Sequence, residues 1–167
     1  MDARLSALFL SFAGLLLGGC ASPSWKEVRF PSPLAREDAW LLADAAARAC
    51  DFLPDARNSD PCRGEMVTLW KERLAPFGKG YRLKLHVRLL PPEEKEAKGL
   101  EFYVERQVNT SMESPFAPKP EDWGGGGQDP RAEALFETHL AARLRRFYGN
   151  TWGEGGKRPK NHLFPGR

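Results

Sequence analysis

Two stretches of alternating residues constrain the fold of this chain more than any other feature of its sequence. In YRLKLHVRLL, residues 81–90, apolar residues alternate with Arg, Lys, His and Arg. LEFYVERQV, residues 100–108, repeats the alternation. A period of two is typical of a half-buried β-strand. Because the charged segment 91–99 joins the two stretches, they predict an antiparallel β-hairpin with a long loop.

The apolar side fixes the register of this hairpin, because a slip of one residue would expose all of its side chains together. Pairing Leu85 with Val104 keeps the apolar residues on one face. The same register sets opposite charges across the other face, Lys84 with Glu105 and Arg88 with Glu101. Opposite charges stabilise a strand ladder. The basic stripe is therefore interpreted as a neutralised, solvent-facing sheet face and not as a polyanion site.

Arg106 interrupts the apolar side of the second stretch, opposite Leu83. Charged residues are rarely buried unless they are paired. Arg106 is therefore interpreted either as the end of the strand or as a charge that points inward, and both interpretations stay open.

Three dipeptides of one kind predict the starts of three helices. In each of them a capping side chain precedes a proline that would occupy the first helical position. The pairs are Ser32-Pro33, Asp60-Pro61 and Asp129-Pro130. Apolar residues at helical spacing follow each pair. We expect helices over 33–51, 61–75 and 130–148, the last of them ended by Gly149.

The N-terminus has the organisation of a secretory signal. Arg4 precedes an uncharged, mostly apolar run over 5–17. The run is shorter than the roughly 20 residues of a membrane-spanning helix and suits the core of a signal peptide. It leads into Leu17-Gly18-Gly19-Cys20, which resembles the lipobox of bacterial lipoproteins. The resemblance implies cleavage before Cys20, a diacylglycerol on its thiol and an acyl chain on its new amine.

The same resemblance implies a location. Ala21 stands where an aspartate would retain a lipoprotein in the inner membrane. We therefore expect a lipid anchor in the outer membrane and a domain that faces the periplasm, with the inner membrane or the cell surface as alternatives. Three acyl chains make a stable anchor, since one chain binds a membrane only marginally. The membrane is thus an expected partner.

Cys50 and Cys62 are the cysteines that remain if Cys20 is lipidated. An even pair in an exported domain is typical of a disulfide, because the compartment is oxidising. Cys50 ends the first predicted helix and Cys62 begins the second, so the bond would staple a helical hairpin. Two cysteines without clustered histidines cannot supply the four ligands of a structural zinc site.

Together these elements predict an α+β fold. It comprises a disulfide-stapled helical hairpin, an antiparallel β-hairpin and a C-terminal helix packed on one sheet face. A third short strand fits near residues 28–30, and the four consecutive glycines within 111–128 predict a flexible loop. The expected organisation is a signal peptide over 1–19, a lipidated tether over 20–32, a single domain over 33–148 and a mobile basic tail over 149–167.

The sequence contains no recognisable catalytic constellation. Its three histidines, His86, His139 and His162, share no metal-ligand spacing, and the Gly-x-Ser-x-Gly elbow of serine hydrolases does not occur. The glycine run lacks the Gly-Lys-Ser/Thr ending of a phosphate-binding loop. A formal net charge of +3 is a mild excess and gives no argument for nucleic acid. We therefore expect no cofactor, no metal and no nucleic-acid partner.

Basic residues gather towards the C-terminus. They are Arg143, Arg145 and Arg146 in the last predicted helix and Lys157, Arg158 and Lys160 in the tail. Such a cluster attracts anionic partners. It is a candidate contact for an envelope protein, for peptidoglycan carboxylates or for anionic lipid head groups.

A tethered domain without catalytic residues suits a non-enzymatic interaction or assembly component at the periplasmic face of the envelope. One alternative is a small enzyme acting on cell wall or envelope lipid, which would need polar groups converging around His86, Tyr103 or His139. Another is a carrier that holds a small apolar ligand between its sheet and its helices.

Overall fold

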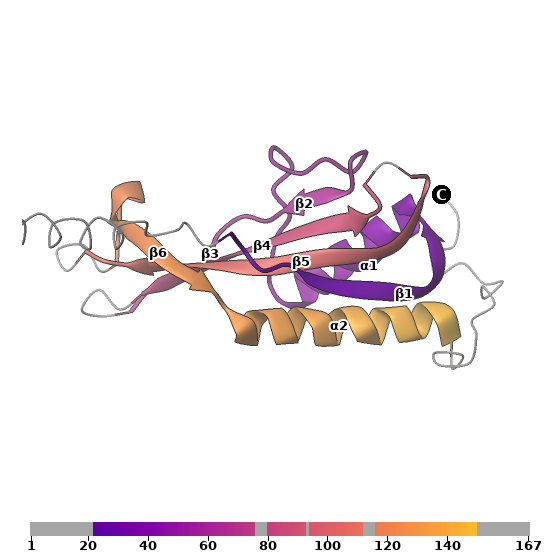
Figure 1. Ribbon diagram of the computed structural model, residues 1–167. Coiled ribbons are helices and arrows are strands. Elements are labelled where there is room, and N and C mark those ends of the chain that lie inside the picture. Colours follow the sequence, from indigo (N-terminus) through magenta and orange to yellow (C-terminus); the bar gives the residue numbers. More distant parts are fainter. Residues whose placement is uncertain (1–21, 76–79, 93, 112–115, 150–167) are drawn as a thin grey trace, which may run out of the picture.

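The β4–β5 hairpin lies at the centre of the fold (Figure 1). The structure is a computed structural model that describes residues 22–75, 80–92, 94–111 and 116–149. Strand β4 (Tyr81–Leu90) pairs antiparallel with β5 (Glu96–Asn109). Leu85 lies opposite Val104, and the charged pairs follow the predicted register, Lys84 opposite Glu105 and Arg88 opposite Glu101. The prediction of the hairpin and its register is confirmed.

Four further strands extend the hairpin on both edges. They are β1 (Lys26–Ala35), β2 (Glu65–Val67), β3 (Lys71–Arg73) and β6 (Trp123–Gln128). Strand β1 pairs with the first half of β5, and β6 pairs with its second half. On the other edge, β2 and β3 pair with different parts of β4. The described part of the chain therefore forms one antiparallel sheet of six strands.

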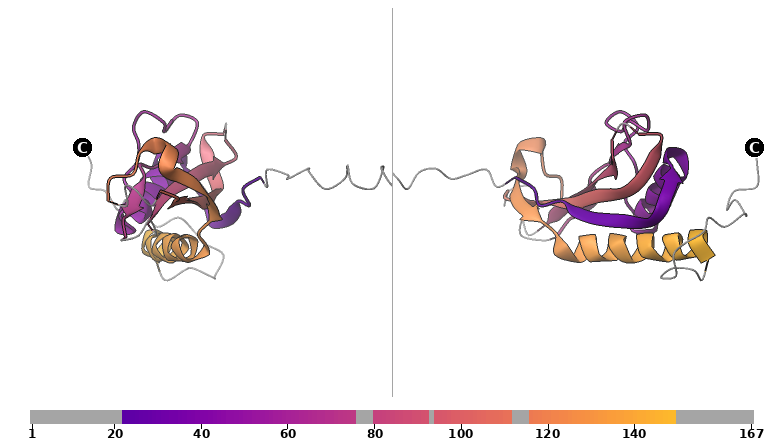
Figure 2. Two further views of the ribbon diagram at one scale, coloured as in Figure 1. Left: turned by 90° about the vertical axis from the view of Figure 1, so that its left-hand side faces the viewer. Right: turned by 45° about the vertical axis from the view of Figure 1, so that its right-hand side comes forward.

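Two helices cover one face of this sheet (Figure 2). Helix α1 (Arg36–Ala49) and helix α2 (Pro130–Tyr148) also pack against each other. The apolar side of the hairpin meets them, and the Phe102 ring lies edge-to-face on Phe136 with centroids 4.8 Å apart. The hydrophobic core therefore lies between the sheet and the helix pair.

Helix α2 has the predicted bounds and the predicted cap. The carboxylate of Asp129 accepts hydrogen bonds from the backbone nitrogens of Arg131 and Ala132, at 3.1 and 2.9 Å. Pro130 occupies the first helical position, and Gly149 ends the helix with a φ of 71°. The sequence-based prediction of this helix is confirmed.

Helix α1 begins later than predicted, because strand β1 continues to Ala35. Ser32 and Pro33 therefore lie in a strand and cap no helix. Strand β1 buries Phe30 and Leu34 in the core. This burial outweighs a capping hydrogen bond, which contributes about 1 kcal/mol. The segment 26–32, expected in the tether, is thus part of the sheet.

The prediction of a helix over 61–75 is wrong. The Asp60 carboxylate does bond the backbone nitrogens of Cys62 and Arg63, at 2.9 and 3.1 Å, but it caps a single turn. Gly64 then takes a φ of 67°, which favours glycine. The chain continues into β2 and β3, where it supplies hydrogen bonds to the outer edge of β4 and buries Met66.

The predicted disulfide is also wrong. Cys50 and Cys62 are free thiols, the first buried and the second exposed. The predicted bond depended on a second helix packed against α1, and with 61–75 folded onto β4 the two thiols line different pockets. Burial raises the pKa of the Cys50 thiol. The predicted fold class is corrected accordingly, since a six-stranded antiparallel sheet with two helices replaces the stapled helical hairpin.

Part of the segment predicted to be a loop is a strand. The four glycines of β6 lie beside β5, although glycine is depleted in strands.

The signal segment 1–19, Cys20 and the tail residues Lys157, Arg158 and Lys160 lie outside the described residues. Within the described residues, neither helix is long and apolar enough to cross a membrane.

Glu133 occupies a gap along the outer edge of β5. Strand β1 pairs with β5 as far as Phe102, and β6 pairs with it from Glu105 onward. Between them, the backbone nitrogen of Val104 donates to Oε1 of Glu133 at 3.3 Å, and the Val104 carbonyl accepts from the Asp129 backbone nitrogen at 2.9 Å. The start of α2 thus completes the edge of the sheet.

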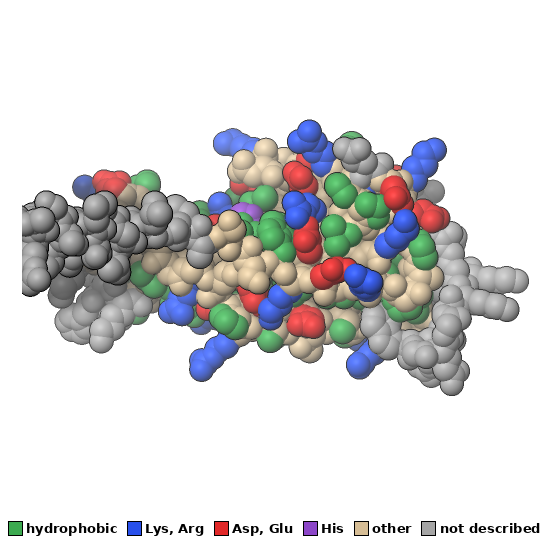
Figure 3. Space-filling model, in the orientation of Figure 1, with side chains coloured by type: hydrophobic (Ala, Val, Ile, Leu, Met, Phe, Trp, Pro, Cys, Tyr) green, Lys and Arg blue, Asp and Glu red, His purple; other side chains and the backbone are tan. Residues whose placement is uncertain are grey.

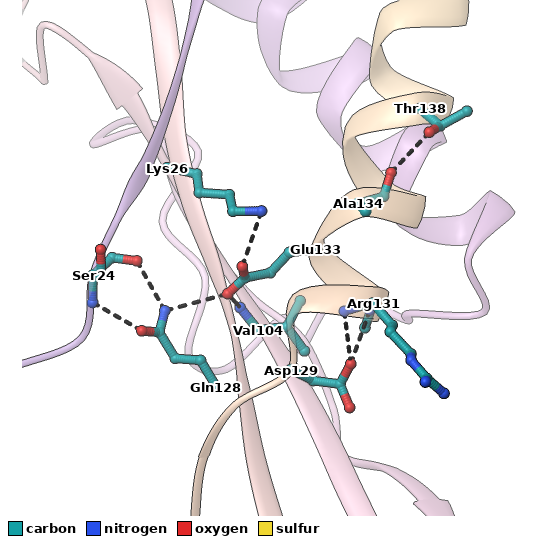
Figure 4. A network of polar contacts seen from close by, with 10 residues as sticks. Ser24, Lys26, Val104, Gln128, Asp129, Arg131, Glu133, Ala134 and Thr138 are labelled. Carbon is teal, nitrogen blue, oxygen red and sulfur yellow. Dashed lines mark hydrogen bonds and ion pairs between the residues drawn. The ribbon is translucent and has the colours of Figure 1, made fainter.

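The Glu133 carboxylate also holds both neighbouring strands (Figure 4). It forms an ion pair with Nζ of Lys26 at 3.2 Å and accepts a hydrogen bond from Nε2 of Gln128 at 3.2 Å. The Gln128 amide in turn bonds the backbone of Ser24 through both its nitrogen and its oxygen. One carboxylate, 3% exposed, therefore joins α2 to β1, β5 and β6.

We predict that Glu133→Ala lowers the free energy of unfolding by about 2–4 kcal/mol, because it leaves a buried backbone N–H unsatisfied and removes an ion pair. Urea unfolding measures this change. Glu137→Ala is the matched control, since Glu137 is exposed one turn later in the same helix. Equal losses in the two variants would contradict this role for Glu133.

Candidate functional site

The sheet face turned away from α1 and α2, here called the open face, is the candidate functional site. Charged and apolar side chains alternate over the side of the molecule opposite α1 (Figure 3). The hairpin contributes the polar and aromatic side chains that alternate with its buried residues, and flanking segments add three tryptophans. The set comprises Arg82, Lys84, His86, Arg88, Glu101, Tyr103, Glu105 and Gln107, with Trp25, Trp70 and Trp123.

A first cluster on the open face, the Trp25 cluster, comprises Trp25, Tyr103, His86 and Arg88. The rings of His86 and Tyr103 are stacked with centroids 4.5 Å apart and 4° between their planes. Trp25 meets Tyr103 edge-on at 4.6 Å, and the Arg88 guanidinium lies 4.7 Å from the centre of the Trp25 ring. The register of the sheet brings these side chains together, because His86 and Tyr103 are direct cross-strand partners.

A second cluster, the Trp70 cluster, comprises Trp70, Arg82, Lys84 and Trp123. The Arg82 guanidinium lies 4.3 Å from the centre of the Trp70 ring and 4.7 Å from that of Trp123. Its Nε and Nη2 both donate to Oε1 of Gln107, at 2.9 and 2.6 Å. Nζ of Lys84 lies over the Trp70 ring at 4.5 Å. Arg82 is therefore held in one orientation by two rings and an amide.

The charges of the open face are paired in part. Arg88 and Glu101 form the predicted ion pair. Glu105 lies opposite Lys84, but its carboxylate contacts Nε2 of His86 at 3.2 Å and accepts a hydrogen bond from Gln107, while Nζ of Lys84 lies over the Trp70 ring. Burial lowers the pKa of His86, and the contact with Glu105 offsets this in part. The neutral imidazole is thus the favoured form of His86 near neutral pH.

The chemistry of the open face suits binding. Trp, Tyr and Arg are the residues enriched in the energetic centres of protein interfaces. Here they are already held by stacking, so less side-chain entropy is lost on association. Among the described residues, no group of three or more His, Cys, Asp or Glu side chains is placed to hold a metal ion.

Three of the basic residues predicted as a partner contact are described by the structure, and they lie on α2, away from the open face. Arg145 and Arg146 are exposed in the last turns of α2. Arg143 is half-buried and donates from Nη1 to the carbonyl of His139 in its own helix, at 3.3 Å. Lys157, Arg158 and Lys160 fall beyond the described residues, as does the lipidation site Cys20.

Sequence reasoning missed two tryptophans of the open face. It predicts Trp70 within the helix over 61–75 and Trp25 within the tether over 20–32. A pattern in the sequence could have indicated the position of Trp25. Residues 25, 27 and 29 alternate with Lys26, Val28 and Phe30. This alternation extends the short strand predicted near 28–30 towards the N-terminus and puts Trp25 on the same face as Glu27.

Comparison with protein-family models finds no match for this chain, and comparison with curated proteins finds none either. The geometry of the open face therefore stands without support from a relative.

We predict that the domain loses stability as the pH falls below about 6.5, the ordinary pKa of histidine, in part because of His86. The folded state depresses the pKa of His86, so the unfolded state takes up its proton first and is stabilised by acid. Thermal unfolding of wild type and His86→Gln between about pH 7.5 and about pH 5.5 tests this, in a range above the carboxylate pKa values. His86→Gln should lose less stability than wild type. Identical pH profiles would refute the assignment.

Proposed function

We propose that this chain is a lipid-anchored, non-enzymatic interaction component of a bacterial envelope. Its anchor is the acylated Cys20 in the outer membrane, and its domain faces the periplasm. The open face is its docking surface for an envelope protein.

The observation that most supports this proposal is the sheet face that neither α1 nor α2 covers. It holds three tryptophans, a tyrosine and two arginines in contact with one another. Sheet faces exposed to water usually carry polar residues opposite the apolar side. Large aromatic side chains on such a face contribute most when a partner excludes water from them. An aromatic, preformed surface of this kind favours binding over catalysis.

The contacts of its basic side chains favour a protein over an anionic surface as the occupant of the open face. Arg88 is paired with Glu101. Arg82 and Lys84 lie over the Trp70 ring, and Arg82 also donates to Gln107. Phosphate-rich partners are bound by unpaired Lys and Arg side chains. Here the aromatic rings and the paired charges offer stacking and directional hydrogen bonds, which suit the side chains and backbone of another protein.

The length of chain between Cys20 and the fold also supports a domain held close to the membrane. Ser24 is fixed to Gln128 by two hydrogen bonds. Three residues, 21–23, lie between Cys20 and Ser24, so the distance from Cys20 to Ser24 is at most about 14 Å in a fully extended chain. A lipid anchor at Cys20 would therefore keep the domain near the bilayer surface, within reach of other envelope proteins.

We predict that Cys20→Ser abolishes lipidation and leaves an uncleaved precursor, because the thiol is the acceptor for the diacylglycerol. Metabolic labelling with a clickable fatty acid, followed by fractionation of the envelope, measures both effects. Cys62→Ser is the matched control, since it removes an exposed thiol outside the lipobox. Equal fatty-acid label in wild type and Cys20→Ser would disprove the anchor.

A site-specific photocrosslinker tests the docking surface in intact cells. We expect benzoylphenylalanine at position 103, on the open face, to give a discrete protein adduct. At position 41, on α1, where Leu41 is 41% exposed, it should give none. Trp25→Ala in the 103 background should reduce the adduct strongly, because truncating an interface tryptophan costs about 2 kcal/mol or more in binding.

Three results would overturn the proposed function. The first is an adduct that forms equally from positions 103 and 41, which indicates unspecific proximity. The second is an adduct that survives both Trp25→Ala and Arg82→Ala in chains whose unfolding free energy is unchanged. The third is that position 103 forms adducts with lipid alone, which would place a membrane on the open face.

A further inference from the structure

A pocket of about 660 Å³ opens on the helix side of the sheet, away from the open face. It lies among the end of α1, strand β3, the start of β4, the second half of β5 and the first turns of α2. Its volume falls in the range of small-molecule sites. Basic and apolar side chains both line it, and this combination indicates which ligand it can hold.

Arg106 is the most informative residue of the pocket. It lies opposite Leu83 on the side of the sheet that faces the helices, so it is the inward charge that the sequence left open. Its guanidinium lies over the Tyr81 ring at 4.9 Å, and its nearest carboxylate, Asp129, is 3.9 Å away. The buried Nε of Arg106 has no hydrogen-bond partner within the described residues. Buried polar atoms are normally satisfied, so Arg106 has spare donor capacity. The side chain as a whole is 40% exposed and lines the pocket, where an anion can reach its guanidinium.

Three further cations line the same pocket. Nζ of Lys71 donates to the Cys50 carbonyl at 2.7 Å and contacts Asp51 at 3.2 Å. Arg73 and Arg131 are exposed at the rim. Asp129 is the one carboxylate among the lining residues, and it already accepts two backbone hydrogen bonds as the cap of α2. The pocket therefore carries an excess of positive charge.

The wall opposite these cations is apolar. Phe52 and Leu83 are buried and line the pocket, while Leu135 lines it although its own side chain is 47% exposed. An inorganic anion would leave this wall in contact with water. A ligand with an apolar body would cover it and remove its apolar surface from water, which favours binding.

We propose that this pocket binds an organic anion with an apolar body, with its phosphate or carboxylate group on Arg106. Lys71, Arg73 and Arg131 add long-range attraction, and Phe52, Leu83 and Leu135 hold the apolar part. The amides of the first turn of α2 take no part, because Asp129 occupies them. The site lies across the sheet from the open face and is independent of the function proposed for that face.

A ligand with an anionic group and an apolar body could be either an envelope lipid or a free organic anion. Calorimetric titration of the full chain in a non-ionic detergent distinguishes them. The probes are dihexanoyl phosphatidate for the lipid and hexyl phosphate for the free anion, with hexanol and inorganic phosphate as controls. We expect one or both amphiphilic anions to bind and both controls to bind at least about tenfold more weakly. The tighter of the two amphiphilic anions identifies the source.

Variants locate the site. Arg106→Gln should weaken binding of the tighter probe by about tenfold or more, since it removes a charge-assisted contact. The double variant Arg73→Gln/Arg131→Gln alters exposed side chains alone and should weaken binding several-fold with the fold intact. Its matched control is Arg57→Gln/Arg63→Gln, which removes two exposed charges that do not line the pocket and should bind like wild type.

Three results would overturn the proposal. The first is that neither amphiphilic anion binds the wild-type chain. The second is that both pocket variants bind like wild type, or that the control double variant weakens binding as much as they do. The third is that inorganic phosphate binds as tightly as hexyl phosphate, because the apolar wall would then contribute nothing.

Discussion

The described fold depends on a single buried carboxylate at the place where three strands and a helix meet. Strand β5 is longer than either of its outer neighbours, so its edge is covered by β1 and β6 in succession. Val104 would be left unpaired between them, and Glu133 accepts its N–H. Because the same carboxylate pairs with Lys26 and Gln128, it fixes where β1 begins, where β6 ends and where α2 starts. The start of α2 is thereby held at the edge of β5, from where α2 packs against α1 and β5.

Covering one face with both helices gives the two sides of the sheet different chemistry. On the helix side, apolar residues form the core. This apolar packing ends at Arg106, which lines a pocket rich in cationic side chains. On the open side, the alternate residues of the same strands carry charges and rings. Trp25 and Trp123 reach that side from the beginning of β1 and of β6, the two strands that Glu133 joins to the edge of β5. A fold organised in this way separates the aromatic open face from the proposed anion pocket by one sheet of backbone.

The sequence predicted those parts of the fold that local patterns determine. A period-two alternation identified β4 and β5 with their register, and a cap with a proline identified α2. The same capping signal was misleading at Asp60, where it forms one turn, because the edge of β4 takes the following residues into β2. Strand pairing over long separations, such as β6 with β5, has no local signature. The candidate site was hidden for that reason, since Trp25, Trp70 and Trp123 meet the hairpin only through such pairings and contacts.

The central claim is that the open face is covered by a protein partner in the envelope. Hydroxyl-radical footprinting of the chain in intact envelopes and after purification tests it most directly, because radical oxidation reports the solvent exposure of individual side chains. The account predicts that Trp25, Trp70 and Tyr103 are oxidised less in envelopes than in the purified chain, while Leu41 on α1 is oxidised equally in both. Equal oxidation of the open-face residues in the two preparations would contradict it.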